Sequence, residues 1–111
     1  MTETEKINFT FTCFMYKQKL KELGITPEEV PHNEIIFVGS RSLGHVYTML
    51  EKMIVFAEEG KDGKAYRWLG FVQGVLWSDG IYSIDDMREH NTSEEEYNKI
   101  NKACNKKEEN T

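Results

Sequence analysis

The sequence predicts an all-α protein, a helical bundle built on a central antiparallel helical hairpin at about 41–79, with a short extended segment at 34–39. Three observations lead to this fold class. Apolar residues recur every three or four positions through most of the chain. Glycines at 24, 60 and 80 follow these periodic segments, where helices commonly end. Only 34–39 is short and β-branched, and no second clear strand exists to pair with it.

Residues 4–23 are predicted to form the first helix. Its apolar face comprises Phe9, Cys13, Tyr16, Leu20 and Leu23, and we expect Ile7, Phe11 and Phe14 to widen that face. The alternation "FTFTCF" also fits a short strand. Helix is favoured because "MYKQKLKEL" continues the helical period and Gly24 supplies a stop.

Two short segments follow this helix. The stretch "TPEEVP" (26–31) is predicted to form one helical turn, with Thr26 as its cap, Pro27 at the first helical position and Pro31 at its end. The segment "EIIFVG" (34–39) is predicted to be extended. It either packs on the helices or forms an edge that pairs with another subunit.

The central hairpin consists of two long periodic segments separated by about three residues. The first begins at Ser40 or Ser42 and ends before Gly60, and Asp62 can cap the second. Such a short connection makes the two helices antiparallel neighbours. The residues expected to be buried together are Val46, Leu50, Met53, Trp68, Leu69, Val72 and Leu76.

Two capping boxes lie beyond the hairpin. Ser83–Asp86 begins a short helix, and Ser93–Glu96 begins a polar helix that runs to about 105. We therefore expect one helical domain at 1–92, followed by a C-terminal polar helix and frayed tail at 93–111.

Composition and charge exclude several classes of function. The chain has 111 residues, a net charge of −5 and a pI of about 5.2, which argues against direct nucleic-acid binding through a basic face. No stretch reaches the apolar length of a membrane span, and "MTETEKINF" is no signal peptide. Cys13 and Cys104 form no CxxC pair. A cytoplasmic protein with reduced thiols and without membrane association is expected.

The search for catalytic and metal motifs finds none. His32, His45 and His90 lie in separate segments without zinc-ligand spacing. No nucleophile elbow or glycine-rich phosphate loop is present, and the adjacent carboxylates Asp85 and Asp86 diverge on a helix. We predict no catalytic residues, no metal, no cofactor and no enzymatic activity.

The stretch "RWLGFVQGVLW" carries the candidate site. Gly70 and Gly74 are four apart on one helix face, and each costs a helix about 0.8–1 kcal/mol relative to alanine. Such glycines usually permit close approach of a ligand, a subunit or a neighbouring helix. The predicted ligand-binding or interface residues are Arg67, Trp77, Tyr66, Gln73, Gly70, Gly74, Arg41 and Tyr82. The alternative is that both tryptophans are core residues and the glycines pass under another helix.

The segment "FAEEGKDGKAYRWLGFVQGVLWSDGIYSIDDMREHN" (56–91) resembles small uncharacterised proteins of tailed bacteriophages and prophages. These share "FAxEG", "KAxRWLGFxQGxLW" and "GxYxIDELRxHN"; this chain has Met87 where leucine is usual. The opening "INFTF…YKxKLKELGITP" is similar to the start of the same family, so the resemblance extends to about residue 92. It implies an accessory phage protein acting in the host cytoplasm, and carries over no functional residues.

Two functional hypotheses follow. The first is a non-enzymatic host-takeover or counter-defence protein that sequesters a small nucleotide-like signal in a homo-oligomer. Aromatic stacking and forked arginine contacts suit a cyclic oligonucleotide or an ADP-ribose-type ligand. The second is an acidic inhibitor that binds a host defence or nucleic-acid-handling protein through a cluster of carboxylates at Asp85, Asp86, Glu89 and Glu94–Glu96.

Overall fold

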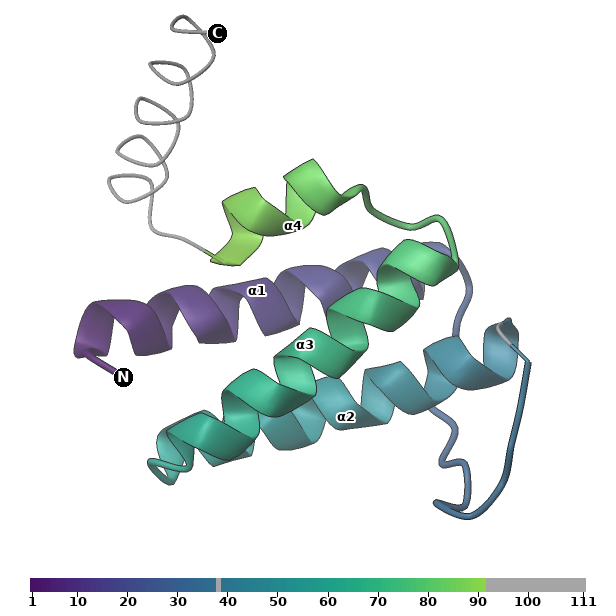
Figure 1. Ribbon diagram of the computed structural model, residues 1–111, viewed down its shortest axis with the longest axis horizontal. Helices are drawn as coiled ribbons and strands as arrows, with labels where there is room; N and C mark the ends of the chain where they lie inside the picture. Colours follow the sequence, from purple (N-terminus) through teal and green to yellow (C-terminus); the bar gives the residue numbers. More distant parts are fainter. Residues whose placement is uncertain (38, 92–111) are drawn as a thin grey trace, which may run out of the picture.

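The computed structural model describes residues 1–37 and 39–91, which form the predicted all-α helical bundle (Figure 1). The helices are α1 (Glu3–Glu22), α2 (Ser40–Glu58), α3 (Asp62–Ser78) and α4 (Ile84–Asn91). α1 packs against α2, α2 packs against α3, and the short α4 lies along α1. The polar helix and tail predicted at 93–111 lie outside the described residues.

The predicted central hairpin is confirmed, because only residues 59–61 separate α2 from the antiparallel α3. Its inner faces and the inner face of α1 form one core. The fully buried side chains of that core are Cys13, Tyr16, Leu20, Val46, Leu50, Met53, Val72 and Leu76. Trp68, predicted to belong to this set, is only partly buried and packs at the edge of the core.

The helix ends follow local sequence. Gly24, Gly60 and Gly80 have φ angles of 78°, 76° and 73°, a conformation that glycine adopts without the steric cost of a side chain. Capping boxes begin α1 at Thr2 and α4 at Ser83. Asp62 does not act as the predicted cap of α3; it is the first helical residue, and its carboxylate pairs with the Met1 ammonium.

The outer face of α1 differs from the prediction. Ile7, Phe11 and Phe14 were expected to widen the buried face, but they are 60%, 68% and 53% exposed. The buried residues of α1 are instead Phe9, Thr12, Cys13, Tyr16 and Leu20. The two sets lie on opposite sides of the helix, because a helix turns about half a revolution every two residues.

The helical turn predicted at 26–31 does not form. The segment lies against the start of α2 instead, where the Glu28 amide donates to the Gly44 carbonyl at 3.1 Å. The Val30 amide donates to His45 Nδ1, also at 3.1 Å. These bonds to α2 replace the backbone bonds that a helical turn would make.

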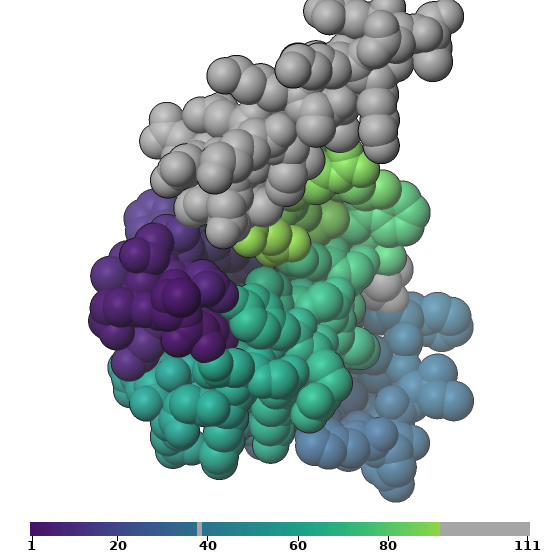
Figure 2. Space-filling view, turned by 60° about the vertical axis from the view of Figure 1, so that its left-hand side comes forward, coloured from purple at the N-terminus to yellow at the C-terminus, as the bar shows by residue number. Residues whose placement is uncertain are grey.

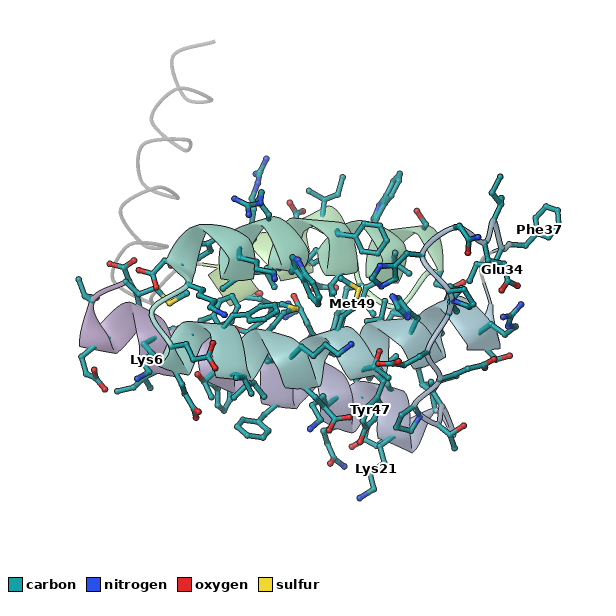
Figure 3. All side chains as sticks on the ribbon, turned by 90° about the horizontal axis from the view of Figure 1, so that it is seen from below. Lys6, Lys21, Glu34, Phe37, Tyr47 and Met49 are labelled. Atoms are coloured by element: carbon teal, nitrogen blue, oxygen red, sulfur yellow. The ribbon has the colours of Figure 1, made fainter. Side chains whose placement is uncertain are left out.

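The segment at 34–39 is extended where the structure describes it, and its described residues form no strand. Ile35 and Phe37 are 98% and 95% exposed. Figure 3 shows Phe37 directed away from the helices at the tip of this connection. Pairing of this segment with another subunit stays a prediction.

Among the described residues, no helix has the length and apolar character needed to cross a bilayer.

Candidate functional site: a cationic and aromatic groove

A groove runs between the 30–36 connection, α2 and α3. It consists of two adjoining pockets with volumes of about 370 and 270 Å³ that share His32, His45 and Phe71. Figure 2 shows the connection before α2 beside α3 on this side of the molecule. The groove is therefore built by three consecutive segments of the chain that fold back against one another.

The two ends of the groove differ in chemistry. The smaller pocket is cationic and aromatic, with Lys52, Arg67, Trp68 and Met49 around the shared residues. Figure 3 shows Met49 between α2 and α3. The larger pocket is mainly apolar, and Glu34 and Ser42 supply polar atoms among Val30, Pro31, Ile36 and Val75. An elongated ligand with one anionic end and one flat apolar end matches this division.

Gly44 allows the connection to approach α2 closely enough to form the groove. A Cβ atom at this position would lie 2.8 Å from the Thr26 carbonyl oxygen and 2.9 Å from Glu28 Cβ. Both distances are shorter than van der Waals contact, so a side chain at 44 would displace the connection. Gly44 therefore permits close packing of the connection on α2.

His45 is held in one tautomer within the groove. Its Nδ1 accepts the Val30 amide, so the neutral ring carries its proton on Nε2. Burial lowers the pKa of His45, and the nearby His32 and Lys52 lower it further. The His32 and His45 rings meet edge to face with centroids 6.3 Å apart. His45 is therefore a neutral hydrogen-bond donor in this groove near pH 7.

Arg67 lines the groove without a carboxylate partner among the described residues. The nearest acids in sequence are occupied elsewhere: Asp62 pairs with the Met1 ammonium, and Glu59 with Lys61 at 2.9 Å. Lys52 also lines the groove, but it pairs with Glu29 at 2.9 Å. The guanidinium of Arg67 is thus the cation best able to accept an anionic ligand here.

Aromatic rings border the same end of the groove. Trp68 packs edge to face on Phe56, with centroids 4.8 Å apart, and Lys64 lies over both rings. Phe71 is 57% exposed. The rings of Trp68 and Phe71 offer flat surfaces beside Arg67 on which a base can stack.

Four of the predicted site residues lie on or beside the outer surface of α3. Apart from the neighbouring backbone of α3 itself, nothing in the described chain lies within 4 Å of the Cβ position at Gly70 or Gly74, and Trp77 is 53% exposed. The described part of the chain therefore places no helix over these glycines. Tyr66 sits near the start of α3, where its hydroxyl donates to Glu5 at 3.3 Å and its ring packs on Phe9.

Gln73, Arg41 and Tyr82 are not part of that surface. Gln73 is buried on the inner side of α3. Arg41 pairs with Glu28 at 3.1 Å and Glu34 at 2.7 Å, and these bonds raise its pKa and lower that of Glu34. The ring of Tyr82 packs on Tyr16, with centroids 5.3 Å apart. The eight predicted residues thus occupy several separate regions, and only Arg67 lines the cationic pocket.

A polar network fastens α4 to the bundle. The Gln73 side chain donates to the Tyr16 hydroxyl at 2.9 Å and exchanges two hydrogen bonds with the Asn91 amide, at 2.6 and 3.0 Å. The Tyr16 hydroxyl also bonds His90 Nδ1 at 2.7 Å. Burial raises the pKa of Tyr16 and lowers that of His90. Gln73 and the "HN" at 90–91 therefore have a structural role in this chain.

Sequence reasoning missed His32, His45, Lys52 and Phe71 as parts of one site. The spacing of the histidines bears only on metal binding, and the described residues contain no group of three or more potential metal-ligating side chains. These residues come together because the connection before α2 folds back toward α2 and α3. The local sequence does not determine the path of that connection. No protein-family model, curated protein or solved structure matches this chain, so its resemblance to phage proteins stays a prediction.

Proposed function

We propose that this protein is a non-enzymatic binder of a small nucleotide-like anion, which it holds in the groove between the 30–36 connection, α2 and α3. The observation that carries this proposal is the position of Arg67: a cation without a carboxylate partner in the described chain, lining a pocket with Trp68 and Phe71. A forked guanidinium suits a phosphate group, and a flat aromatic ring suits a base.

The shape of the groove supports a ligand with distinct ends. Phosphate groups would bind at the pocket lined by Arg67 and Lys52, and His45 would donate from Nε2. A base or ribose would extend past Phe71 toward Val75 and Ile36. This arrangement suits a cyclic oligonucleotide or an ADP-ribose-type ligand.

The biological role is proposed from the resemblance to phage proteins. A phage accessory protein that binds a host nucleotide signal without converting it acts by sequestration in the host cytoplasm. We expect the binder to be a homo-oligomer. This expectation is supported by large apolar side chains that the described chain leaves exposed, among them Ile35, Phe37 and Trp77.

The test is a melting screen against cyclic dinucleotides, cyclic trinucleotides, ADP-ribose and its cyclic derivatives, with inorganic phosphate and adenosine as partial ligands. A ligand present at a hundredfold excess over its Kd stabilises the native state by about 2.7 kcal/mol. In a domain of this size, each kcal/mol raises Tm by about 4–8 °C.

Arg67→Ala should leave the fold intact and weaken binding by about 1.5–3 kcal/mol, the contribution of a hydrogen bond to a charged group. Arg88→Ala is the matched control, because it removes the same charge from the exposed surface of α4. Equal loss in both variants would mean that net charge and not the groove governs binding. If no compound raises Tm, the acidic-inhibitor hypothesis is favoured, and affinity for a basic host protein should then fall sharply with salt.

A further inference from the structure

The outer face of α1 carries three large apolar side chains that the described chain leaves exposed. Ile7, Phe11 and Phe14 are 60%, 68% and 53% exposed. Their steps of four and three residues place them along one stripe of the helix, the spacing by which helices pair in coiled coils. Large apolar side chains that are exposed side by side in this way commonly belong to a surface that binds a partner.

The two ends of this stripe carry opposite charges. Glu3 precedes Ile7 by one turn and lies on the same side of the helix. Lys6 is the exception at this acidic end, and the Glu5 carboxylate accepts from Tyr66 on α3, away from the stripe. Lys17 and Lys21 follow Phe14 at steps of three and seven, and Lys17 lies over the Phe14 ring at 5.6 Å. Figure 3 shows Lys21 at the end of α1 farthest from the acidic first turn. Glu22 is the exception at the basic end, and its carboxylate accepts from Gln18 at 3.4 Å.

We propose that α1 pairs with α1 of a second copy of this chain, antiparallel about a two-fold axis. In that orientation Phe11 of one copy packs beside Phe14 of the other, and the acidic end containing Glu3 lies beside the basic end containing Lys21. Both ends become complementary at once, as a self-complementary two-fold interface requires. A parallel pair would instead place like charges together.

The interface is small, so the dimer is weak. One stripe on one helix covers less than the roughly 800 Å² per partner of a standard stable interface. We expect a dissociation constant in the micromolar range. The stripe shares no residue with the groove, so the two copies present independent grooves and the dimer does not depend on the proposed function.

The first experiment measures molar mass against concentration by light scattering and sedimentation. The wild-type chain should pass from monomer to dimer over the micromolar range. Phe11→Glu should remain monomeric throughout with an unchanged helical CD spectrum. Ile84→Glu, at a residue that is 54% exposed on α4, is the matched control and should dimerise like the wild type.

The second experiment tests the orientation by charge reversal. Glu3→Lys and Lys21→Glu should each weaken the dimer by about 10-fold, a change of 1.4 kcal/mol, because each places like charges at both ends of the interface. The double variant restores opposite charges in an antiparallel pair and should recover wild-type affinity. A wild-type chain that stays monomeric, a Phe11→Glu variant that still dimerises, or a double variant no tighter than its parents would each overturn the proposal.

Discussion

At the scale of single residues, one glutamine links three helices. Gln73 lies on α3 between the buried residues Leu69 and Leu76, and its amide bonds Tyr16 on α1 and Asn91 on α4. A buried amide is stable only when its hydrogen-bonding groups have partners. The paired amides of Gln73 and Asn91 satisfy each other, which explains how a short polar helix stays attached with Met87 as its only buried residue.

Replacing Gln73 by leucine should destabilise the fold. The substitution retains side-chain volume but leaves the Asn91 amide without its partner and removes one of the two hydrogen bonds of the Tyr16 hydroxyl, at a cost of about 1–3 kcal/mol. Urea denaturation should report this as a lower free energy of unfolding. Gln18→Leu is the matched control on the exposed side of α1 and should change stability by less than about 0.5 kcal/mol. Equal effects of the two substitutions would contradict the network.

Stability should also depend on the protonation of His90. Burial lowers its pKa, although Asp86 and Glu89 oppose the shift. The unfolded chain then binds a proton at a higher pH than the folded chain does. The free energy of unfolding therefore decreases as pH falls below about 6.5, the ordinary histidine value. His45 shifts in the same direction.

His90→Asn is the test of this pH dependence, because it keeps a polar group near the Tyr16 hydroxyl and removes the titration. Urea midpoints measured between about pH 7 and 5 should fall less steeply in the variant than in the wild type. The remaining slope in this window reflects His45. The carboxylates with lowered pKa values, such as Glu29 and Glu34, contribute only at more acidic pH. Parallel curves for the two proteins would exclude His90 as a contributor.

At the scale of secondary-structure elements, the connection between α1 and α2 is positioned by one glycine. Gly44 lies within α2, where glycine is unfavourable by about 1 kcal/mol relative to alanine. The backbone at Thr26 and Glu28 occupies the space that its Cβ would fill. The connection carries His32 and Ile36 into the groove, so the groove depends on this close approach.

Gly44→Ala should therefore displace the connection and leave the helices intact. We expect hydrogen exchange at the Glu28 and Val30 amides to accelerate, and ligand binding in the groove to be lost, without a loss of helical CD signal. Gly70→Ala is the matched control, because nothing lies near its Cβ position; it should raise stability by about 0.5–1 kcal/mol. Unchanged exchange at Glu28 and Val30 would show that the backbone can accommodate the methyl group.

The sequence predicts these elements unevenly, for physical reasons. Helices and their ends are local, so the apolar period and the glycines at 24, 60 and 80 located them within a few residues. The helical turn predicted at 26–31 does not form, because the backbone of this segment makes hydrogen bonds to α2 instead. The groove could not be predicted, because it depends on how the connection before α2 folds back against α2 and α3, a tertiary contact that local sequence patterns do not encode. Gln73 was predicted as a site residue because it is polar. Its position between Leu69 and Leu76 instead places it on the buried face of α3.

At the scale of the whole molecule, α1, α2 and α3 share one core. Leu50 on α2 is fully buried and belongs to the same cluster as Tyr16 on α1 and Leu76 on α3. A single core predicts a single cooperative unfolding transition for this domain. Trp68 lies at the edge of that core and also lines the groove. Substitutions at Trp68 and at Leu50 should therefore have different effects on stability and on ligand binding.

Comparison of Leu50→Ala with Trp68→Ala should separate the core from the groove. Leu50→Ala creates a cavity in the centre of the core and should lower the free energy of unfolding by about 2–5 kcal/mol. Trp68→Ala should cost less, because its ring is only partly buried, but it should weaken nucleotide binding, because one wall of the Arg67 pocket is removed. Urea denaturation followed by CD gives the first quantity, and ligand-dependent melting gives the second. If Trp68→Ala is as destabilising as Leu50→Ala and leaves binding intact, then Trp68 is a core residue and its assignment to the ligand groove is wrong.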